Sequence, residues 1–154
     1  MVELRVIKRN ELFVALIFHR IGFLPTFIKY RDRTNPIFKT YFDFKKYKNS
    51  PNLIMYWIIF DNKKVGQIWI KKRESYGAIA RIFVLKPWQN RGIAQQAIMQ
   101  AEKLFNEYKL WKLDTIEREK NNCHLYEKLG YKPTGHRQQI NNKMTIIDYT
   151  KSLK

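Results

Sequence analysis

The feature that most constrains the fold is a change of hydrophobic period after residue 85. Residues 53–60, 64–72 and 76–85 are apolar, β-branched segments separated by short turns, a pattern that predicts consecutive antiparallel strands. Residues 92–105 instead repeat apolar side chains every three or four positions, which predicts an amphipathic helix, and 110–116 is again strand-like. Because a helical crossover joins strands that run in the same direction, the strands at 76–85 and 110–116 should be parallel.

The remaining segments predict a small mixed domain around this crossover. A strand at 4–7 precedes a helix at 11–18, for which Asn10 is the expected N-cap, and a polar loop at 30–35 precedes Pro36. The other expected elements are a helix at 37–47, a helix at 121–129 ended by Gly130, and strands at 131–138 and 143–150. The chain has no repeat, low-complexity tract or linker, so we expect one α+β domain over 1–154, with a mixed, mostly antiparallel sheet and helices on both faces.

Positive charge is in excess along the whole chain. Thirty Lys and Arg residues against 13 Asp and Glu give +17, and residues 1–50, 51–100 and 101–154 contribute +7, +6 and +4. This even distribution argues against a basic nucleic-acid-binding arm. It leaves a solvated surface, an anionic ligand or an acidic macromolecule as explanations, and we expect no specific nucleic-acid partner.

Cysteine content and apolar run length bear on location. The single cysteine excludes an intrachain disulfide and fits a reducing compartment. The longest apolar run, 53–60, is shorter than the about 20 residues that cross a bilayer. We therefore expect a cytoplasmic protein without a membrane partner.

The segment 84–94 carries the strongest chemical signal. A strand ends, a polar loop follows, and a helix begins at Gly92 directly after Arg91. The first N–H groups of a helix are unpaired and partly positive, so they suit phosphate oxygens, and a glycine lets a ligand approach the backbone closely. From these residues alone, an anion site and an ordinary helix start both remain open.

A second segment, 121–131, places Tyr126 one helical turn before Gly130. By itself this tyrosine could simply pack in the core. Together and in this order, however, Gln89-Asn90-Arg91-Gly92-Ile93-Ala94 and Leu125-Tyr126-Glu127-Lys128-Leu129-Gly130-Tyr131 resemble the acetyl-CoA loop and the tyrosine segment of the GNAT acetyltransferase superfamily. The resemblance runs from about Val65 to Thr150, while the first 60 residues match only in the order of elements.

The resemblance implies a binding mode for acetyl-CoA. The backbone amides of 89–94 would hold the pyrophosphate, and the strand edge at 83–85 would pair with the pantetheine arm between strands 4 and 5, which splay apart in the family. An amide near Val84 or Leu85 would polarise the thioester carbonyl, and Tyr126 would protonate the departing thiolate or donate a hydrogen bond to it. The implied cofactor-binding residues are Phe83, Val84, Leu85, Gln89, Asn90, Arg91, Gly92, Ile93, Ala94 and Asn122.

The chain departs from the family pattern at two places. Glu119 stands seven residues before the tyrosine, where the family often has asparagine, so Asn121 or Asn122 would take over its pantetheine contact. The strand at 76–85 has no glutamate to act as general base. The base would then be a water molecule, Glu117 or Glu119, with Asp114 a weaker candidate.

Two other kinds of chemistry are disfavoured by spacing. Cys123 and His124 are adjacent and point about 100° apart on a helix, so they cannot form a nucleophile–base pair. The three histidines lack Cys or carboxylate companions at ligand spacing, and we expect no metal.

We expect an acetyl-CoA-dependent N-acetyltransferase in which a primary amine, of a small molecule or a protein, attacks directly. The loop 29–36 would form a wall of the acceptor site, and Arg31, Arg33 and Arg81 would favour an amine that carries acidic groups. A non-catalytic acyl-CoA-binding domain and a nucleic-acid-associated basic protein are the alternatives. Oligomeric state is expected to be a monomer or a homodimer.

Overall fold

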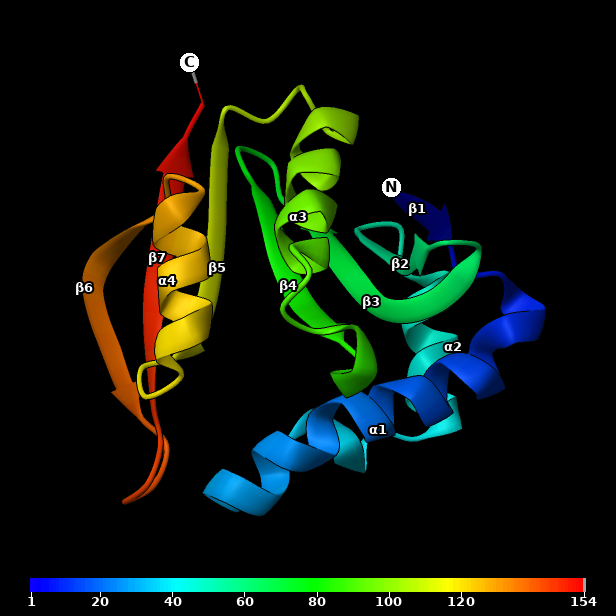
Figure 1. Ribbon diagram of the computed structural model, residues 1–154, viewed down its shortest axis with the longest axis horizontal. Helices are drawn as coiled ribbons and strands as arrows, with labels where there is room; N and C mark the ends of the chain where they lie inside the picture. The colour runs from blue at the N-terminus through cyan, green and yellow to red at the C-terminus, as the bar shows by residue number, and fades with distance from the viewer. Residues whose placement is uncertain (154) are drawn as a thin grey trace.

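A seven-stranded mixed sheet organises the chain in the computed structural model, which describes residues 1–153 (Figure 1). The strand order is β1-β2-β3-β4-β5-β7-β6, and every neighbouring pair is antiparallel except β4–β5. The strands are β1 (Val2–Val6), β2 (Leu53–Phe60), β3 (Lys63–Lys72), β4 (Gly77–Val84), β5 (Leu110–Ile116), β6 (Lys132–Gln139) and β7 (Thr145–Ser152). The helices are α1 (Leu12–Tyr30), α2 (Tyr41–Asn49), α3 (Ile93–Leu104) and α4 (Lys120–Lys128), with short 3-10 turns η1 (Arg9–Glu11), η2 (Pro36–Phe38) and η3 (Lys86–Trp88).

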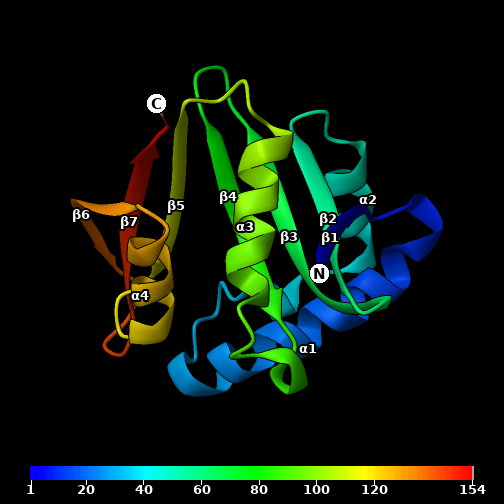
Figure 2. The ribbon, with the colours of Figure 1, turned by 45° about the horizontal axis from the view of Figure 1, so that its top comes forward.

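Helices cover both faces of the sheet, as predicted. On one face α1 and α2 enclose a cluster that includes Leu16, Phe44 and Trp69, and on the other α3 and α4 cover a larger cluster that includes Ile98 and Trp111. Figure 2 shows α3 and α4 side by side above the sheet and α1 crossing one end of it. The α+β architecture with a parallel crossover is therefore confirmed.

The two parallel strands touch only at one end. Register pairs between β4 and β5 are limited to Gly77 with Trp111 and Ala78 with Lys112. A side chain at Gly77 would lie 3.0 Å from the Trp111 ring, so glycine permits this close contact. Beyond Ala78 the strands diverge, and in Figure 1 the gap widens toward the end where α3 and α4 begin. The expected splaying of strands 4 and 5 is present.

Helix α1 is longer than the sequence analysis predicted. It continues from Leu12 to Tyr30 instead of ending at Phe18, and it passes through Gly22 and Pro25. The helix persists because its inner side packs on the sheet, so closely that a side chain at Gly22 would clash with the Phe83 ring. Asn10 is not the N-cap, because it lies inside η1.

The segment Arg9–Tyr30 is long and apolar enough to cross a membrane by length and composition. The sequence analysis missed it, because it took the helix to stop at Phe18. In the fold, one side of α1 is buried against the domain through Leu12, Ala15, Leu16, His19 and Tyr30.

Helix α2 begins at Tyr41 and not at residue 37 as predicted. The Thr40 hydroxyl accepts a hydrogen bond from the Asp43 amide, and the Asp43 carboxylate accepts one from the Thr40 amide at 2.7 Å. This reciprocal cap fixes the helix start, and Pro36–Phe38 forms the separate turn η2.

Candidate active site

Helices α3 and α4 both begin at the edge of the sheet where the gap opens. Each follows one of the two parallel strands, α3 after β4 and α4 after β5. Ligands of sheets with parallel strands commonly bind at the carboxyl ends of those strands, beside helix N-termini. The candidate site is therefore the gap between β4 and β5 together with these two helix starts (Figure 2).

The loop before α3 presents unpaired amides. Asn90 and Gly92 have left-handed backbone conformations with φ of 63° and 74°, on either side of Arg91. Within residues 1–153, the N–H groups of 90–94 have no backbone hydrogen-bond acceptor, whereas that of Gln89 donates to the Lys86 carbonyl at 3.2 Å. Nothing lies within 4 Å of the position a Gly92 side chain would take. The loop thus presents several amides to open space, an arrangement that suits an anion.

Side chains hold this loop on the sheet. The Gln89 side-chain amide donates to the Val84 carbonyl at 2.8 Å. The Trp88 ring packs edge-on against Phe60 and lies 5.1 Å from the Arg91 guanidinium and 5.5 Å from the Lys63 ammonium. The Gln89 side chain therefore positions the loop, while Arg91 and Lys63 place two positive charges beside it.

The edge of β4 faces the gap with the backbone groups of alternate residues, of which the Val84 carbonyl is occupied by the Gln89 side chain. The Leu85 amide donates to the Val65 carbonyl at 2.8 Å, so it is used inside the sheet. Because backbone groups in an antiparallel ladder face alternate sides, Phe83 also bonds toward β3, whereas Val84 and Ile82 face the gap. Of the three residues predicted to meet the cofactor here, Phe83, Val84 and Leu85, only Val84 has its amide on this side, and Ile82, which was not among them, faces the same way.

Tyr126 lies on α4 and is 6% exposed. Its ring packs near those of Tyr131 and Tyr149, and its hydroxyl has no hydrogen-bond partner among the described residues. Burial, with a smaller contribution from the charge of Asp114, raises the pKa of the Tyr126 phenol. The hydroxyl therefore keeps its proton at neutral pH and can act as a hydrogen-bond donor.

Glu119, at the start of α4, is tied to α1. Its carboxylate accepts hydrogen bonds from the Lys29 ammonium and the Tyr30 hydroxyl, each at 2.6 Å. Burial opposes its ionisation, but these two hydrogen bonds outweigh that effect and lower the pKa of Glu119. A polar cavity of about 270 Å³ opens here, lined by Lys29, Arg118, Glu119, Lys120, Asn121 and Asn122.

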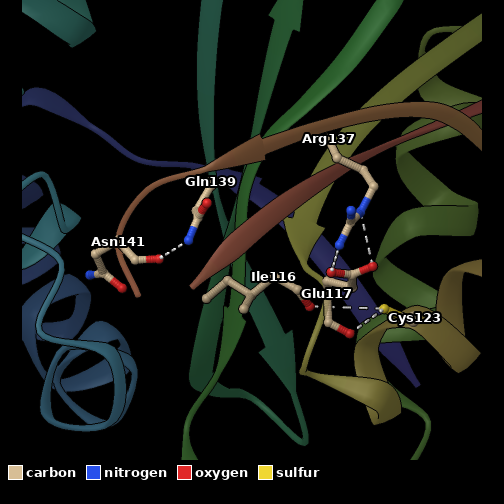
Figure 3. Close-up of polar contacts among 6 residues, drawn as sticks. All are labelled: Ile116, Glu117, Cys123, Arg137, Gln139 and Asn141. Carbon is tan, nitrogen blue, oxygen red and sulfur yellow. Dashed lines mark hydrogen bonds and ion pairs between the residues drawn. The ribbon is translucent and has the colours of Figure 1, made fainter. Parts of the chain in front are cut away.

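Glu117 is held in a bidentate ion pair. Arg137 contacts its two carboxylate oxygens at 3.1 and 2.6 Å (Figure 3), and this hydrogen bonding lowers the pKa of Glu117. The same figure shows the Cys123 sulfur directed at the carbonyls of Ile116 and Glu117, 3.9 and 3.8 Å away. Cys123 is buried and His124 is exposed, so the two do not form a catalytic pair.

The pKa of Asp114 is shifted in the opposite direction from those of Glu117 and Glu119. Asp114 lies opposite Asp148 across the β5–β7 ladder, and Asp148 is paired with His136 at 2.9 Å. Solvent reaches the Asp114 side chain, yet enough protein surrounds it that desolvation raises its pKa, with a further increase from the Asp148 charge. Among the three carboxylates considered, Asp114 alone has a pKa shifted toward neutrality.

The loop that was expected to form a wall of the acceptor site follows the end of α1. The carbonyl of Tyr30 accepts a hydrogen bond from the Asn141 side chain at 3.0 Å, which joins the end of α1 to the β6–β7 turn. Arg31 and Arg33 are exposed in the loop that follows. Arg81 instead lies beneath α1 and α2, so the structure separates it from the two loop arginines.

Arg81 forms a polar pair with a buried histidine. Its guanidinium lies 4.7 Å from the Trp69 ring and 3.0 Å from Nε2 of His19. His19 has no exposed surface, and burial, followed by the Arg81 charge, lowers the pKa of His19 to about 3. The neutral imidazole can therefore accept a hydrogen bond from Arg81.

Side-chain clusters of the kind that bind metal ions are absent from the described part of the chain. No group of three or more His, Cys, Asp or Glu side chains is arranged to hold a metal ion within residues 1–153.

Solved acetyltransferase structures have the same fold. A Bacillus anthracis protein assigned to streptothricin acetylation, in complex with acetyl coenzyme A, is 26% identical, with a TM-score of 0.62 over 71% of this chain and 68% of that one. The ribosomal-protein-S18-alanine N-acetyltransferase of Escherichia coli matches 100% of this chain and 95% of its own at a TM-score of 0.76 and 11% identity. The spermidine N-acetyltransferase of Vibrio cholerae, in complex with CoA and spermine, matches 97% and 94% at 0.75 and 15%.

The sequence itself matches a family model. No curated protein is similar enough in sequence to match the chain. The model of the acetyltransferase (GNAT) family matches residues 22–131, which include the gap, the amide loop and Tyr126. With this match over most of its length and the fold of its structural neighbours, the chain belongs to the GNAT family of acetyltransferases.

Proposed function

We propose that the protein transfers the acetyl group of acetyl-CoA to a primary amine in a ternary complex. The observation that carries this proposal is that two features lie on either side of η3: the amides of 90–94, which have no backbone acceptor within residues 1–153, and the gap-facing edge of β4, which pairs with no strand beyond Ala78 among those residues. Together they form one track of backbone donors and acceptors. A pyrophosphate group followed by an extended amide-containing arm, as in coenzyme A, matches such a track.

Each part of the cofactor lies at a different position along this track. The pyrophosphate lies on the amides of 90–94, and the pantetheine arm pairs with Val84 at the edge of β4. Its thioester lies farthest from the phosphates, so the amide of Ile82 is better placed than that of Val84 to polarise the carbonyl. Asn122, in the polar cavity at the start of α4, is available for the asparagine contact that Glu119 cannot supply.

Acetyl transfer then needs a group that donates a hydrogen bond to the departing sulfur. The amine nitrogen forms a bond to the carbonyl carbon, the C–S bond breaks, and the sulfur departs as coenzyme A. Because burial raises the pKa of Tyr126 above that of a free phenol, which is already about 10 against about 8.5 for a thiol, complete proton transfer is unfavourable. Tyr126 therefore acts by donating a hydrogen bond to the sulfur as negative charge develops on it.

The attacking amine must also lose a proton. Glu117 and Glu119 are committed to cationic partners and have lowered pKa values, which makes them weak bases. Asp114 has a raised pKa, and its charge contributes to the raised pKa of Tyr126. Asp114 takes the proton directly or through a water molecule, in place of the glutamate that β4 lacks.

A screen of amines tests the proposal. Wild-type protein is mixed with acetyl-CoA and polyamines, amino acids, aminoglycosides or peptides with a free N-terminus, while free thiol is monitored. Thiol release that depends on one class of amine, with an acetylated product of matching mass, is the expected result. Tight acetyl-CoA binding in calorimetry without release by any amine would favour the non-catalytic acyl-CoA-binding alternative instead.

A further inference from the structure

The outer face of α1 is an exposed apolar stripe. Five residues spaced by three or four positions lie on it and are 43–63% exposed: Phe13, Ile17, Ile21, Leu24 and Ile28. They lie opposite the buried side of α1. A surface helix normally places polar residues where this stripe lies, yet Arg20 is the only charged residue between Leu12 and Ile28.

The stripe continues onto the neighbouring elements. A groove of about 460 Å³ runs between α1 and η2, lined by Arg20, Ile21, Leu24, Ile37 and Phe38. Phe38 is 54% exposed, and Phe42 on α2 is 71% exposed. We call this surface, formed by the stripe with Phe38 and Phe42, the α1 patch. A contiguous apolar surface of this kind marks an interaction site.

Basic side chains border the α1 patch. Arg20 lines the groove and donates to the Lys39 carbonyl, and the Lys45 ammonium lies 5.0 Å and 5.7 Å from the rings of Tyr41 and Phe42. Residues 12–50 contain eight basic and two acidic side chains. Both carboxylates are engaged locally: Asp32 is buried and accepts from Thr34, and Asp43 caps α2.

We propose that the α1 patch binds the surface of an anionic phospholipid bilayer. Apolar side chains that enter the headgroup region, bordered by lysine and arginine, are the features by which interfacial helices bind such surfaces. A second copy of the chain fits the patch poorly, because it would bring two cationic borders of the same +17 molecule together. Since the inner side of α1 is packed on the sheet, the helix lies on the bilayer and does not span it.

Vesicle flotation with the full chain tests this inference. We expect the protein to float with phosphatidylcholine vesicles that contain phosphatidylglycerol, and not with phosphatidylcholine alone. The double variant Ile17→Gln/Ile21→Gln should reduce the bound fraction at least about tenfold, since it removes two inserted apolar side chains. Lys45→Gln should weaken binding about fivefold, the effect of one cation near an anionic surface.

Exposed apolar residues on another helix provide the matched control. Met99 and Leu104 on α3 are 52% and 57% exposed, and Met99→Gln/Leu104→Gln should bind vesicles like the wild type. The far-ultraviolet spectrum and thermal unfolding of every variant establish that it is folded. Equal losses in both double variants, or binding that ignores phosphatidylglycerol, would overturn the proposal. So would sedimentation showing a dimer that Ile17→Gln/Ile21→Gln dissociates, together with no flotation.

Discussion

The N-terminal half of the sheet, β1 to β4, and the C-terminal half, β5 to β7, differ in how completely they are packed. Strands β1 to β4 are paired along their lengths, and the N-terminal half holds buried tryptophans at Trp57 and Trp69 beneath α1 and α2. In the C-terminal half, every residue of the outer strand β6 is exposed, and Lys112 and Asp114 of β5 are open on the face away from α4. The halves pair through only two residues of each strand.

This difference separates two tasks. The rigid half supplies backbone groups, the amides of 90–94 and the edge of β4, whose positions depend on regular strand pairing. The C-terminal half supplies two side chains, Tyr126 and Asp114, whose pKa values are raised by burial. In the proposed function these side chains must also be reached by the substrates. Substitutions in the N-terminal half should therefore weaken cofactor binding, and substitutions in the C-terminal half should slow acetyl transfer.

The largest expected effect is on chemistry, from Tyr126→Phe. The substitution keeps the buried ring but removes the hydroxyl, which in the proposed function donates a hydrogen bond to the sulfur in the transition state. We expect kcat to fall about 100-fold, while KM for acetyl-CoA changes little. Steady-state and single-turnover rates measure this effect. Tyr56→Phe, which removes a buried hydroxyl in β2, is the control, and wild-type kcat in Tyr126→Phe would show that this tyrosine only packs.

The next effect is on cofactor binding, from Gly92→Glu. A carboxylate at this position places bulk and negative charge where the pyrophosphate lies, so the affinity for acetyl-CoA should fall at least about tenfold, or about 1.4 kcal/mol. Calorimetric titration measures it. Gly135→Glu is a matched control, because Gly135 also has positive φ and open space around it, but lies on β6. Equal affinity in the two folded variants would move the cofactor site away from this loop.

The pH dependence of the reaction rate tests the proposed role of Asp114. Asp114 is a base only when ionised, so kcat/KM for the amine should decline as the pH falls through its raised pKa. Asp114→Asn should remove this decline and lower the rate at neutral pH about tenfold, because water can still carry the proton. In Asp148→Asn the neighbouring negative charge is lost, which shifts the decline to lower pH. An unchanged profile in Asp114→Asn would assign the proton to another acceptor.

The smallest effect concerns the tie between the halves. Glu119→Gln weakens the bonds to Lys29 and Tyr30, which connect α4 to α1, and the pair is partly exposed. We expect a loss of about 0.5–1 kcal/mol in unfolding free energy, measured by urea denaturation at neutral pH. Glu117→Gln provides the comparison, because its partner Arg137 lies in the same half. If Glu119→Gln were as stable as the wild type, the Glu119 contacts would contribute nothing measurable to joining the two halves.

Local sequence patterns predicted the parts of the site that depend on local geometry. The crossover was visible because the hydrophobic period changes, and the amide loop because a polar loop and Gly92 precede a helix. Tyr126 was singled out because Leu125–Tyr131 resembles the tyrosine segment of the GNAT superfamily. In each case the residues involved are close together in the chain.

The features that the sequence analysis missed depend on contacts between distant segments. Which amides of β4 face the gap follows from its register with β3, including an irregularity between Trp69 and Ile70. Asp114 meets Asp148 only because β7 lies between β5 and β6 in the sheet. The full length of α1 likewise reflects packing on the sheet, which overrides the local signals of Gly22 and Pro25.

The buried imidazole of His19 makes folding of the N-terminal half sensitive to proton uptake. An unfolded chain protonates a histidine near pH 6.5, whereas the pKa of His19 in the fold is about 3. Between these two values the unfolded chain binds a proton that the folded chain excludes, so each step toward lower pH favours unfolding. Mild acid therefore loosens the half that carries the cofactor track, while the carboxylates of Glu117 and Glu119, with their lowered pKa values, are still ionised.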